Sequence, residues 1–121
     1  LAQYSPGMAY FNTQQYEEAI SYLEDFSSDD VLLSALANGA LGDAHAQLGD
    51  KQKALQYYKA AVKASTNDFT TPKYLFKAGL LGANLNQNSE ALGYFKRIQE
   101  EFSASPEAAQ IEIQIGRLEN Q

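Results

Sequence analysis

Few residues of this chain have the types and spacing that catalysis requires. His45 is the single histidine, so no second histidine is available to complete a metal triad. Asp43 lies only two residues away, and the two side chains therefore point to different sides of a helix. Gly79 and Gly82 do not form a phosphate-binding loop, because no Lys-Ser/Thr pair follows them. We therefore predict that the chain is not an enzyme and holds no metal and no cofactor.

The charged residues are distributed unevenly. Residues 1–50 carry eight acids and no Lys or Arg, whereas residues 51–121 carry nine bases and seven acids, so the two parts have net charges of −8 and +2. Adjacent acids such as Asp29 and Asp30 are expected at solvated faces or before a helix, where the helix dipole favours negative charge. Nucleic acid is not expected as a partner, because phosphate binding needs a concentrated basic face. A basic partner, or a second copy meeting head to tail, fits this distribution.

Length and composition indicate one folded globular domain over residues 1–121, with 45% hydrophobic and 20% charged residues. The chain has no cysteine, which excludes disulfides and thiolate metal sites. It contains no run of 18 apolar residues, so we expect no membrane contact by this segment itself. Since the chain begins at Leu1, we expect a fragment or a processed form from which an upstream anchor or signal was removed.

A small residue recurs at a fixed interval in three places. A glycine is followed twelve residues later by an alanine in the pairs Gly7–Ala19, Gly42–Ala54 and Gly79–Ala91. The glycines lie 35 and 37 residues apart, a period typical of stacked helical arrays. Glycine costs about 1 kcal/mol relative to alanine inside a helix, so its recurrence indicates a packing requirement. We predict that the two helices of each unit meet near these small residues.

The apolar spacing around each pair predicts an all-α fold made of two antiparallel helices per unit. Three helix-turn-helix repeats are expected at about 1–28, 29–65 and 71–103, followed by a capping helix at about 105–120. The helices are predicted near 2–12, 15–26, 30–47, 51–64, 72–86, 88–102 and 106–119.

The last helix has an ambiguous pattern. Ile111–Ile115 alternates like a strand, but the chain offers no second strand to pair with it. Ala108, Ile111, Ile115 and Leu118 also form a helical stripe, which predicts a helix that caps the array. That helix turns Ile113 away from the stripe, which predicts an exposed apolar end able to make a weak contact with another molecule.

The units resemble the tetratricopeptide repeat (TPR), whose pattern is W-x2-L-G-x2-Y, then A-x3-F, then P. The second unit reads Asn38-x2-Leu41-Gly42-x2-His45, followed by Ala54-x3-Tyr58. The first-position Trp and the terminal Pro are missing in all three units. The resemblance implies an α-α superhelix, also called a TPR solenoid, that acts as a non-catalytic scaffold for protein–protein interaction.

In this family the first helix of each unit lines a concave groove that binds a polypeptide. When the groove positions of the family are transferred to this sequence, the resemblance implies a partner groove formed by Tyr4, Met8, Phe11, Asp43, Gln47, Lys73, Phe76, Leu80 and Asn84. Only Lys73 suits the carboxylate clamp known in the family, and Asp43 would repel a carboxylate. The apolar members suit an apolar helix or an extended peptide. The alternative is that these residues are covered by a segment preceding Leu1 or belong partly to the core.

Two hypotheses for the function follow. The first is a scaffold that binds a protein or peptide, and the alternative is a structural module that self-assembles head to tail into a weak homo-oligomer. Residues 16–55 and 69–80 are also similar to bacterial single-span TPR proteins, in which a membrane helix precedes the repeats. That similarity implies a location on the periplasmic side of the cytoplasmic membrane.

Overall fold

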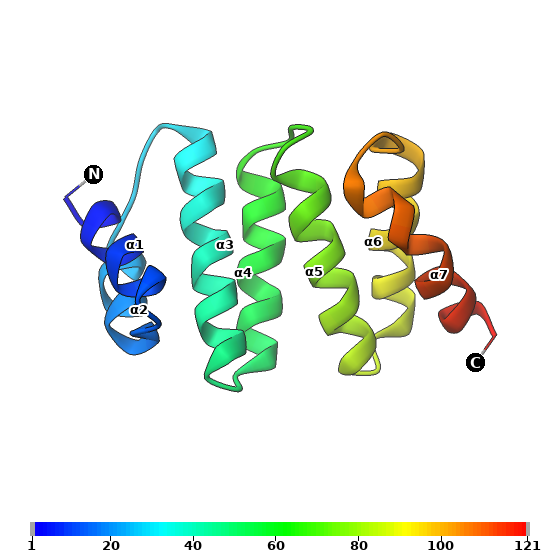
Figure 1. The fold of residues 1–121 in the computed structure, drawn as a ribbon, viewed down its shortest axis with the longest axis horizontal. Helices are drawn as coiled ribbons and strands as arrows, with labels where there is room; N and C mark the ends of the chain where they lie inside the picture. The colour runs from blue at the N-terminus through cyan, green and yellow to red at the C-terminus, as the bar shows by residue number, and fades with distance from the viewer. Residues whose placement is uncertain (1, 121) are drawn as a thin grey trace. The chain divides into compact units, whose positions relative to one another are not determined.

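The structure is a computed structural model that describes residues 2–120 (Figure 1). Within that range it contains α-helices and one 3-10 helix and no strand, so the prediction of an all-α fold is confirmed. The elements are α1 (Tyr4–Asn12), α2 (Tyr16–Glu24), α3 (Val31–Gln47), α4 (Lys51–Ala64), α5 (Thr71–Asn84), α6 (Asn88–Glu101), the 3-10 helix η1 (Pro106–Gln110) and α7 (Ile111–Glu119).

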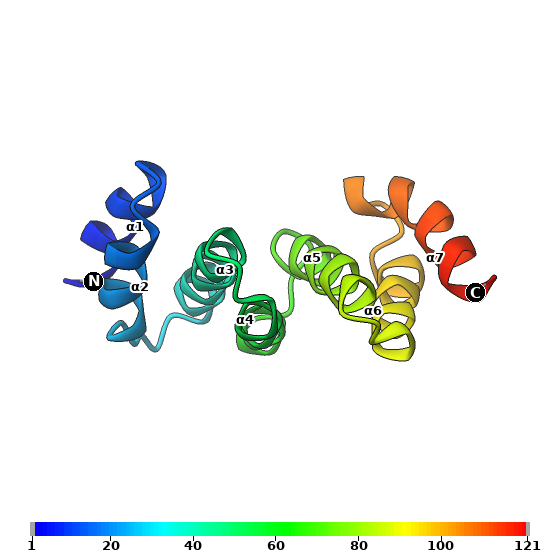
Figure 2. The same ribbon diagram turned by 90° about the horizontal axis from the view of Figure 1, so that it is seen from below.

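The chain divides into two compact units, unit 1 (Leu1–Ser65) and unit 2 (Thr66–Gln121). Unit 1 contains two helical hairpins, α1–α2 and α3–α4, and α2 also packs against α3. Unit 2 contains the hairpin α5–α6, with α7 packed against α6. In Figures 1 and 2, α3 and α4 run side by side and are joined by a tight turn. The prediction of one domain over residues 1–121 stays a prediction.

The three hairpin turns share one backbone geometry. Each contains a residue with positive φ: Gln14 at 64°, Gly49 at 87° and Asn86 at 62°. The next residue in each turn donates its N–H to a carbonyl five residues earlier, at 2.8–2.9 Å. A residue with positive φ, followed by a residue whose N–H donates back to a carbonyl of the last helical turn, is the Schellman motif, which commonly ends helices. The three turns therefore repeat at the same spacing as the three glycines.

The capping helix differs from the prediction at its start. The predicted α-helix over residues 106–119 begins instead as the 3-10 helix η1, and α7 starts only at Ile111. In this turn the Ala108 N–H donates to the Ser105 carbonyl three residues earlier at 3.1 Å, which is the hydrogen bond of a 3-10 helix, and the Ser105 hydroxyl accepts from the same N–H at 3.2 Å. Ile111 and Ile115 are buried and helical, so the strand interpretation is excluded.

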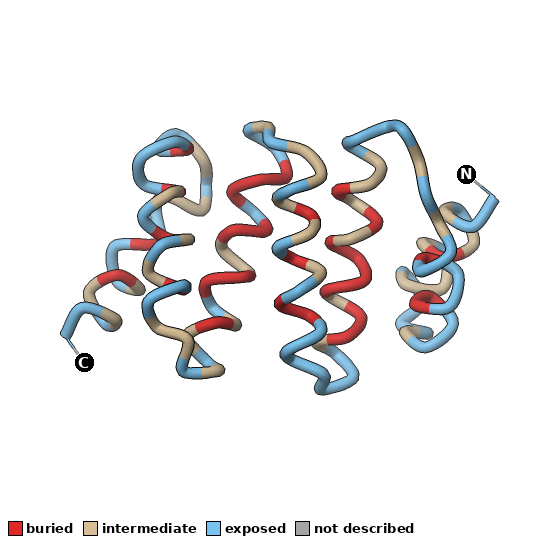
Figure 3. The backbone as a smooth tube through the Cα atoms, turned by 180° about the vertical axis from the view of Figure 1, so that it is seen from behind, coloured by how far each residue is buried: buried red, intermediate tan, exposed pale blue. Residues whose placement is uncertain are grey.

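A glycine in each hairpin faces a large side chain sixteen residues later in the chain. A Cβ added at Gly7 would lie 2.8 Å from Leu23, one at Gly42 would lie 2.6 Å from the Tyr58 ring, and one at Gly79 would lie 2.5 Å from the Phe95 ring. Cβ atoms do not approach other atoms this closely, so a side chain at any of these positions requires the facing Leu, Tyr or Phe side chain to shift. Figure 3 shows the buried residues recurring along these helices.

The alanines of the three glycine–alanine pairs lie beside the contact between the glycine and the large side chain, and do not form it. Ala19, Ala54 and Ala91 are all fully buried. The carbonyl oxygen of Ala54 would lie 3.2 Å from a Cβ at Gly42, which is close to the predicted pairing. In unit 2 the expected pairing is displaced, because Gly79 faces Phe95 and Ala91 lies opposite Gly82. The twelve-residue interval from glycine to alanine thus identifies the hairpins, but each glycine makes its closest contact with the residue four positions after that alanine.

Gly42→Leu is expected to lower the free energy of unfolding by about 3 kcal/mol, because the new side chain overlaps the Tyr58 ring. Gly93→Ala in α6 is the matched control, since a Cβ there meets nothing within 4 Å. The control should raise stability by up to about 1 kcal/mol through helix propensity. Urea denaturation of both variants measures the difference, and an unchanged midpoint for Gly42→Leu would show that the helices do not meet there.

Candidate functional site

The three predicted groove residues of α1 take part in the core of unit 1. Tyr4, Met8 and Phe11 are half-buried and pack against the cluster formed by Ile20, Leu23, Ala37, Ala40, Leu41 and Ala44. The Tyr4 ring lies 5.1 Å from the ring of Phe26, and the Phe11 ring lies 5.9 Å from the ring of Tyr16. Burial also raises the pKa of the Tyr4 hydroxyl. These three side chains leave only part of their surface to a partner.

On α3, the predicted residue Asp43 is held by the second helix of its own hairpin. The Tyr58 hydroxyl donates a hydrogen bond of 2.6 Å to the Asp43 carboxylate. The same Tyr58 ring covers Gly42, so one side chain supplies both the packing and the hydrogen bond. Gln47 lies one helical turn after Asp43 on the same face and is exposed.

On α5, the four predicted residues follow one another at helical spacing. Lys73 and Asn84 are exposed, Phe76 is half-buried and Leu80 is 40% exposed. The Lys73 ammonium lies 5.5 Å from the centre of the Tyr74 ring. Phe76 makes an edge-on contact with Phe95, with the ring centres 6.0 Å apart. Because the spacing is three to four residues, the four side chains share one face of α5, with an apolar middle and polar ends.

His45 is a packing residue of unit 1. It is 8% exposed, and its ring lies parallel to the Tyr57 ring at 5.3 Å. The Nε2 atom is buried and has no hydrogen-bond partner among the described residues. Burial lowers the pKa of His45, and the nearby Lys53 lowers it further, whereas Asp50 and Glu24 act in the opposite direction. The imidazole therefore favours the neutral form.

The described residues offer no site for a metal ion or a membrane span. Nowhere between residues 2 and 120 do three or more histidine, aspartate or glutamate side chains gather as metal ligands. No helix in the same range is both long and apolar enough to cross a lipid bilayer.

The two structural units divide the charges differently from the division at residue 50 used for the sequence, because unit 1 extends to Ser65. Four lysines, namely Lys51, Lys53, Lys59 and Lys63, lie on α4 within unit 1. Unit 1 therefore carries eight acids and four bases, and unit 2 carries seven acids and five bases, giving net charges of −4 and −2. Both units are acidic. The contrast lies inside unit 1, between the acids of α2 with its following loop and the lysines of α4.

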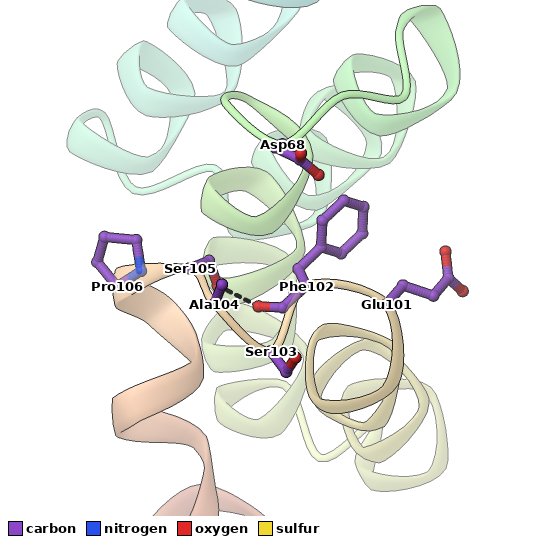
Figure 4. Close-up of a pocket in the computed structure, with 7 residues that line it drawn as sticks. All are labelled: Asp68, Glu101, Phe102, Ser103, Ala104, Ser105 and Pro106. Carbon is purple, nitrogen blue, oxygen red and sulfur yellow. Dashed lines mark hydrogen bonds between the residues drawn. The ribbon is translucent and has the colours of Figure 1, made fainter.

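The hollows on the surface of the structure were not anticipated from the sequence, and two of them lie beside turns. One, of about 370 Å³, lies on α1 and its turn beside Pro6, Ala9 and Tyr10. The other, of about 340 Å³, lies in unit 2 beside the turn between α6 and η1 (Figure 4). Both involve turn residues, whose side-chain directions do not follow from helical periodicity.

The sequence profile of one family, described as the tetratricopeptide repeat, matches residues 5–69. This match covers more than half of the chain and spans helices α2 to α4 and all of α1 after its first residue. A comparison with curated proteins finds no match to the chain.

The stability of the chain is expected to fall as pH is lowered from about 6.5, the ordinary pKa of a histidine in an unfolded chain. Because the pKa of His45 is lower in the folded state, the unfolded state takes up the proton first, and this part of the stability is lost as pH falls through the folded pKa. His45→Phe keeps the ring stacked on Tyr57 and removes the titration. Urea denaturation at several pH values should show a shallower acid dependence for the variant, and equal slopes would contradict this account.

Proposed function

The chain belongs to the tetratricopeptide repeat family, and from that premise we propose that it binds a polypeptide segment through the first helices of its repeats. Tetratricopeptide repeats form α-α superhelices and generally mediate protein–protein interaction as non-catalytic scaffolds.

The observation that carries the proposal is the face of α5. Leu80 is 40% exposed and lies between the polar side chains of Lys73 and Asn84, with the half-buried Phe76 beside it. An apolar centre with a polar rim is the usual composition of a peptide-binding surface. A rigid helix also holds these side chains in place before binding, which reduces the entropy cost of association.

The chemistry of the partner follows from the charges. The first and third helices carry no Lys or Arg, and the whole chain has a net charge of −6. A carboxylate clamp is not supported, because a negatively charged ligand would find few bases and would meet Asp43. The net charge of the chain attracts basic segments, whereas the face of α5 carries Lys73 and no acid. We infer that the partner is an amphipathic helix or an extended peptide that places regularly spaced apolar side chains on α5 and keeps its basic side chains away from Lys73.

An NMR titration with a synthetic amphipathic peptide of Leu and Lys residues tests this proposal. We expect saturable shifts at the amides of Lys73, Leu80 and Asn84, and Leu80→Ser should weaken binding about tenfold through lost apolar contact. Ile113→Ser is the matched control, because it removes an exposed aliphatic side chain from α7 instead. Shifts confined to other surfaces, or equal weakening by both substitutions, would contradict the proposal.

A second candidate function is self-association through the end of unit 2. Ile113 is 65% exposed, Ala109 of η1 is exposed, and a Cβ at Gly116 would meet nothing within 4 Å, so these three positions form a small, shallow apolar strip along η1 and α7. In a head-to-tail contact, the acids of α2 and the loop after it in a second copy would face Arg117, the base of α7, and not a basic surface, because unit 2 has a net charge of −2.

Ile113→Glu tests this second candidate by light scattering at low salt. If the wild type self-associates through this end, the added charge should reduce the association, because a carboxylate cannot be buried there without a partner. Equal self-association of the wild type and Ile113→Glu would show that this end is ordinary surface.

We also propose that the natural setting is the periplasmic side of a bacterial cytoplasmic membrane. This rests only on the similarity of residues 16–55 and 69–80 to single-span TPR proteins.

A further inference from the structure

Unit 1 contains a hollow whose lining includes none of the residues predicted for the partner groove. We call it the Asn38 hollow. It measures about 170 Å³, and its lining comes from the end of α2 and from α3 and α4: Leu23, Glu24, Phe26, Ser34, Ala37, Asn38, Leu41 and Tyr57. The volume is smaller than the roughly 300–1,000 Å³ of pockets that hold drug-sized ligands. It therefore suits a single side chain of another polypeptide.

The hollow lies where this chain departs from the sequence pattern of its family. The pattern W-x2-L-G-x2-Y has Trp three residues before Leu-Gly, and Asn38 stands at that position before Leu41 and Gly42. Asn38 is half-buried and lines the hollow from α3, with Ser34 one turn before it and Leu41 one turn after it on the same face. A short amide side chain thus stands where the pattern has a bulky indole, and space beside it stays open.

The polar atoms around the Asn38 hollow are suited to accept hydrogen bonds. The Asn38 Nδ2 donates to the Ser34 carbonyl at 2.9 Å, whereas its Oδ1 accepts no hydrogen bond from any residue between 2 and 120. The Ser34 hydroxyl donates to the Ser28 carbonyl at 3.2 Å, so its oxygen keeps lone pairs that can accept. The Glu24 carboxylate forms no ion pair with another described residue. A complementary side chain therefore brings donors.

The charge at the hollow is negative. Glu24 is the last residue of α2, where the helix dipole is also negative, and the last turn of α2 contains no base. Lys53 lies one turn before Tyr57 on α4, but its ammonium forms no ion pair with Glu24 within residues 2–120. Burial raises the pKa of the Tyr57 hydroxyl, and the nearby Glu24 carboxylate raises it further. Glu24 therefore attracts a cation toward a hydroxyl that stays neutral and can accept a hydrogen bond.

We propose that the Asn38 hollow binds an arginine side chain of a partner polypeptide. A guanidinium carries a fixed positive charge and five N–H donors in one plane, which suit a carboxylate with neighbouring acceptors better than the ammonium of lysine does. The aliphatic part of the arginine packs on Leu23, Ala37 and Leu41, which are buried and line the hollow. The site lies in unit 1 and does not depend on the face of α5.

An NMR titration of the full 121-residue chain tests the proposal with the blocked peptide Gly-Ser-Arg-Ser-Gly. We expect saturable shifts at the amides of Glu24, Asn38 and Tyr57. Citrulline in place of the arginine keeps the shape of the side chain and removes its charge, so it should weaken binding about tenfold or more. Lysine at the same place should bind more weakly than arginine, because it lacks the planar set of donors.

Four substitutions locate the site. Glu24→Gln should weaken binding about tenfold, whereas the matched control Asp25→Asn removes the same charge from the next residue, which does not line the hollow, and should change the affinity less than about twofold. Asn38→Trp introduces the residue of the family pattern and fills the hollow, so binding should be lost without a loss of stability in urea denaturation. Leu80→Ser, which tests the face of α5, should leave binding of the arginine peptide unchanged.

Several results would overturn the proposal. These are equal binding of the arginine and citrulline peptides, equal weakening by Glu24→Gln and Asp25→Asn, or full binding by folded Asn38→Trp; if Asn38→Trp does not fold, the pair Glu24→Gln and Asp25→Asn decides. Loss of binding in Leu80→Ser would assign the peptide to α5 instead. Arg117 is an exposed base of α7. Self-association of the wild type that is lost in both Arg117→Gln and Asn38→Trp would overturn the proposal in favour of a second copy as the occupant.

Discussion

The close approach of two helices at a glycine is the constraint on which each hairpin depends. A Cβ at Gly42 or Gly79 would overlap an aromatic ring of the following helix, so the helices would have to separate. The consequence extends beyond packing, because the Tyr58 ring that covers Gly42 also places its hydroxyl 2.6 Å from Asp43. Each of the three turns then reverses the chain seven residues after its glycine, at Gln14, Gly49 and Asn86. One small residue thus determines both the spacing and the register of its hairpin.

This packing decides which side chains are left for other molecules. The ring of Tyr58 engages one predicted partner residue, Asp43, and the core of unit 1 takes up much of the three apolar residues of α1. On α5, in contrast, Phe95 packs against Gly79 and Phe76, and Leu80 keeps an exposed surface one turn away. Among the apolar residues predicted to line the groove, Leu80 is therefore the most exposed.

Most of the fold could be predicted from the repeat period, because a glycine inside a helix is costly and its regular recurrence indicates close helix packing. Helix ends were predicted to within a few residues, except that the last helix begins with η1, where the Ala108 N–H donates to a carbonyl three residues earlier instead of four. The site was less predictable. Periodicity assigns a residue to a face, but it cannot tell that Phe95 rather than Ala91 meets Gly79, since that depends on the length of the opposing side chain. It also says nothing about the Asn38 hollow, which depends on the sizes of side chains from three helices.

The most direct test of the glycine contact is a double-mutant cycle of Gly79→Ala and Phe95→Leu, measured by urea denaturation. Leucine is smaller than phenylalanine and leaves room for the added methyl group. Gly79→Ala should therefore cost less in the Phe95→Leu background than in the wild type, with a coupling energy of about 1 kcal/mol or more. Strictly additive effects would contradict the account, because they would show that residue 79 and the ring of Phe95 do not share the same space.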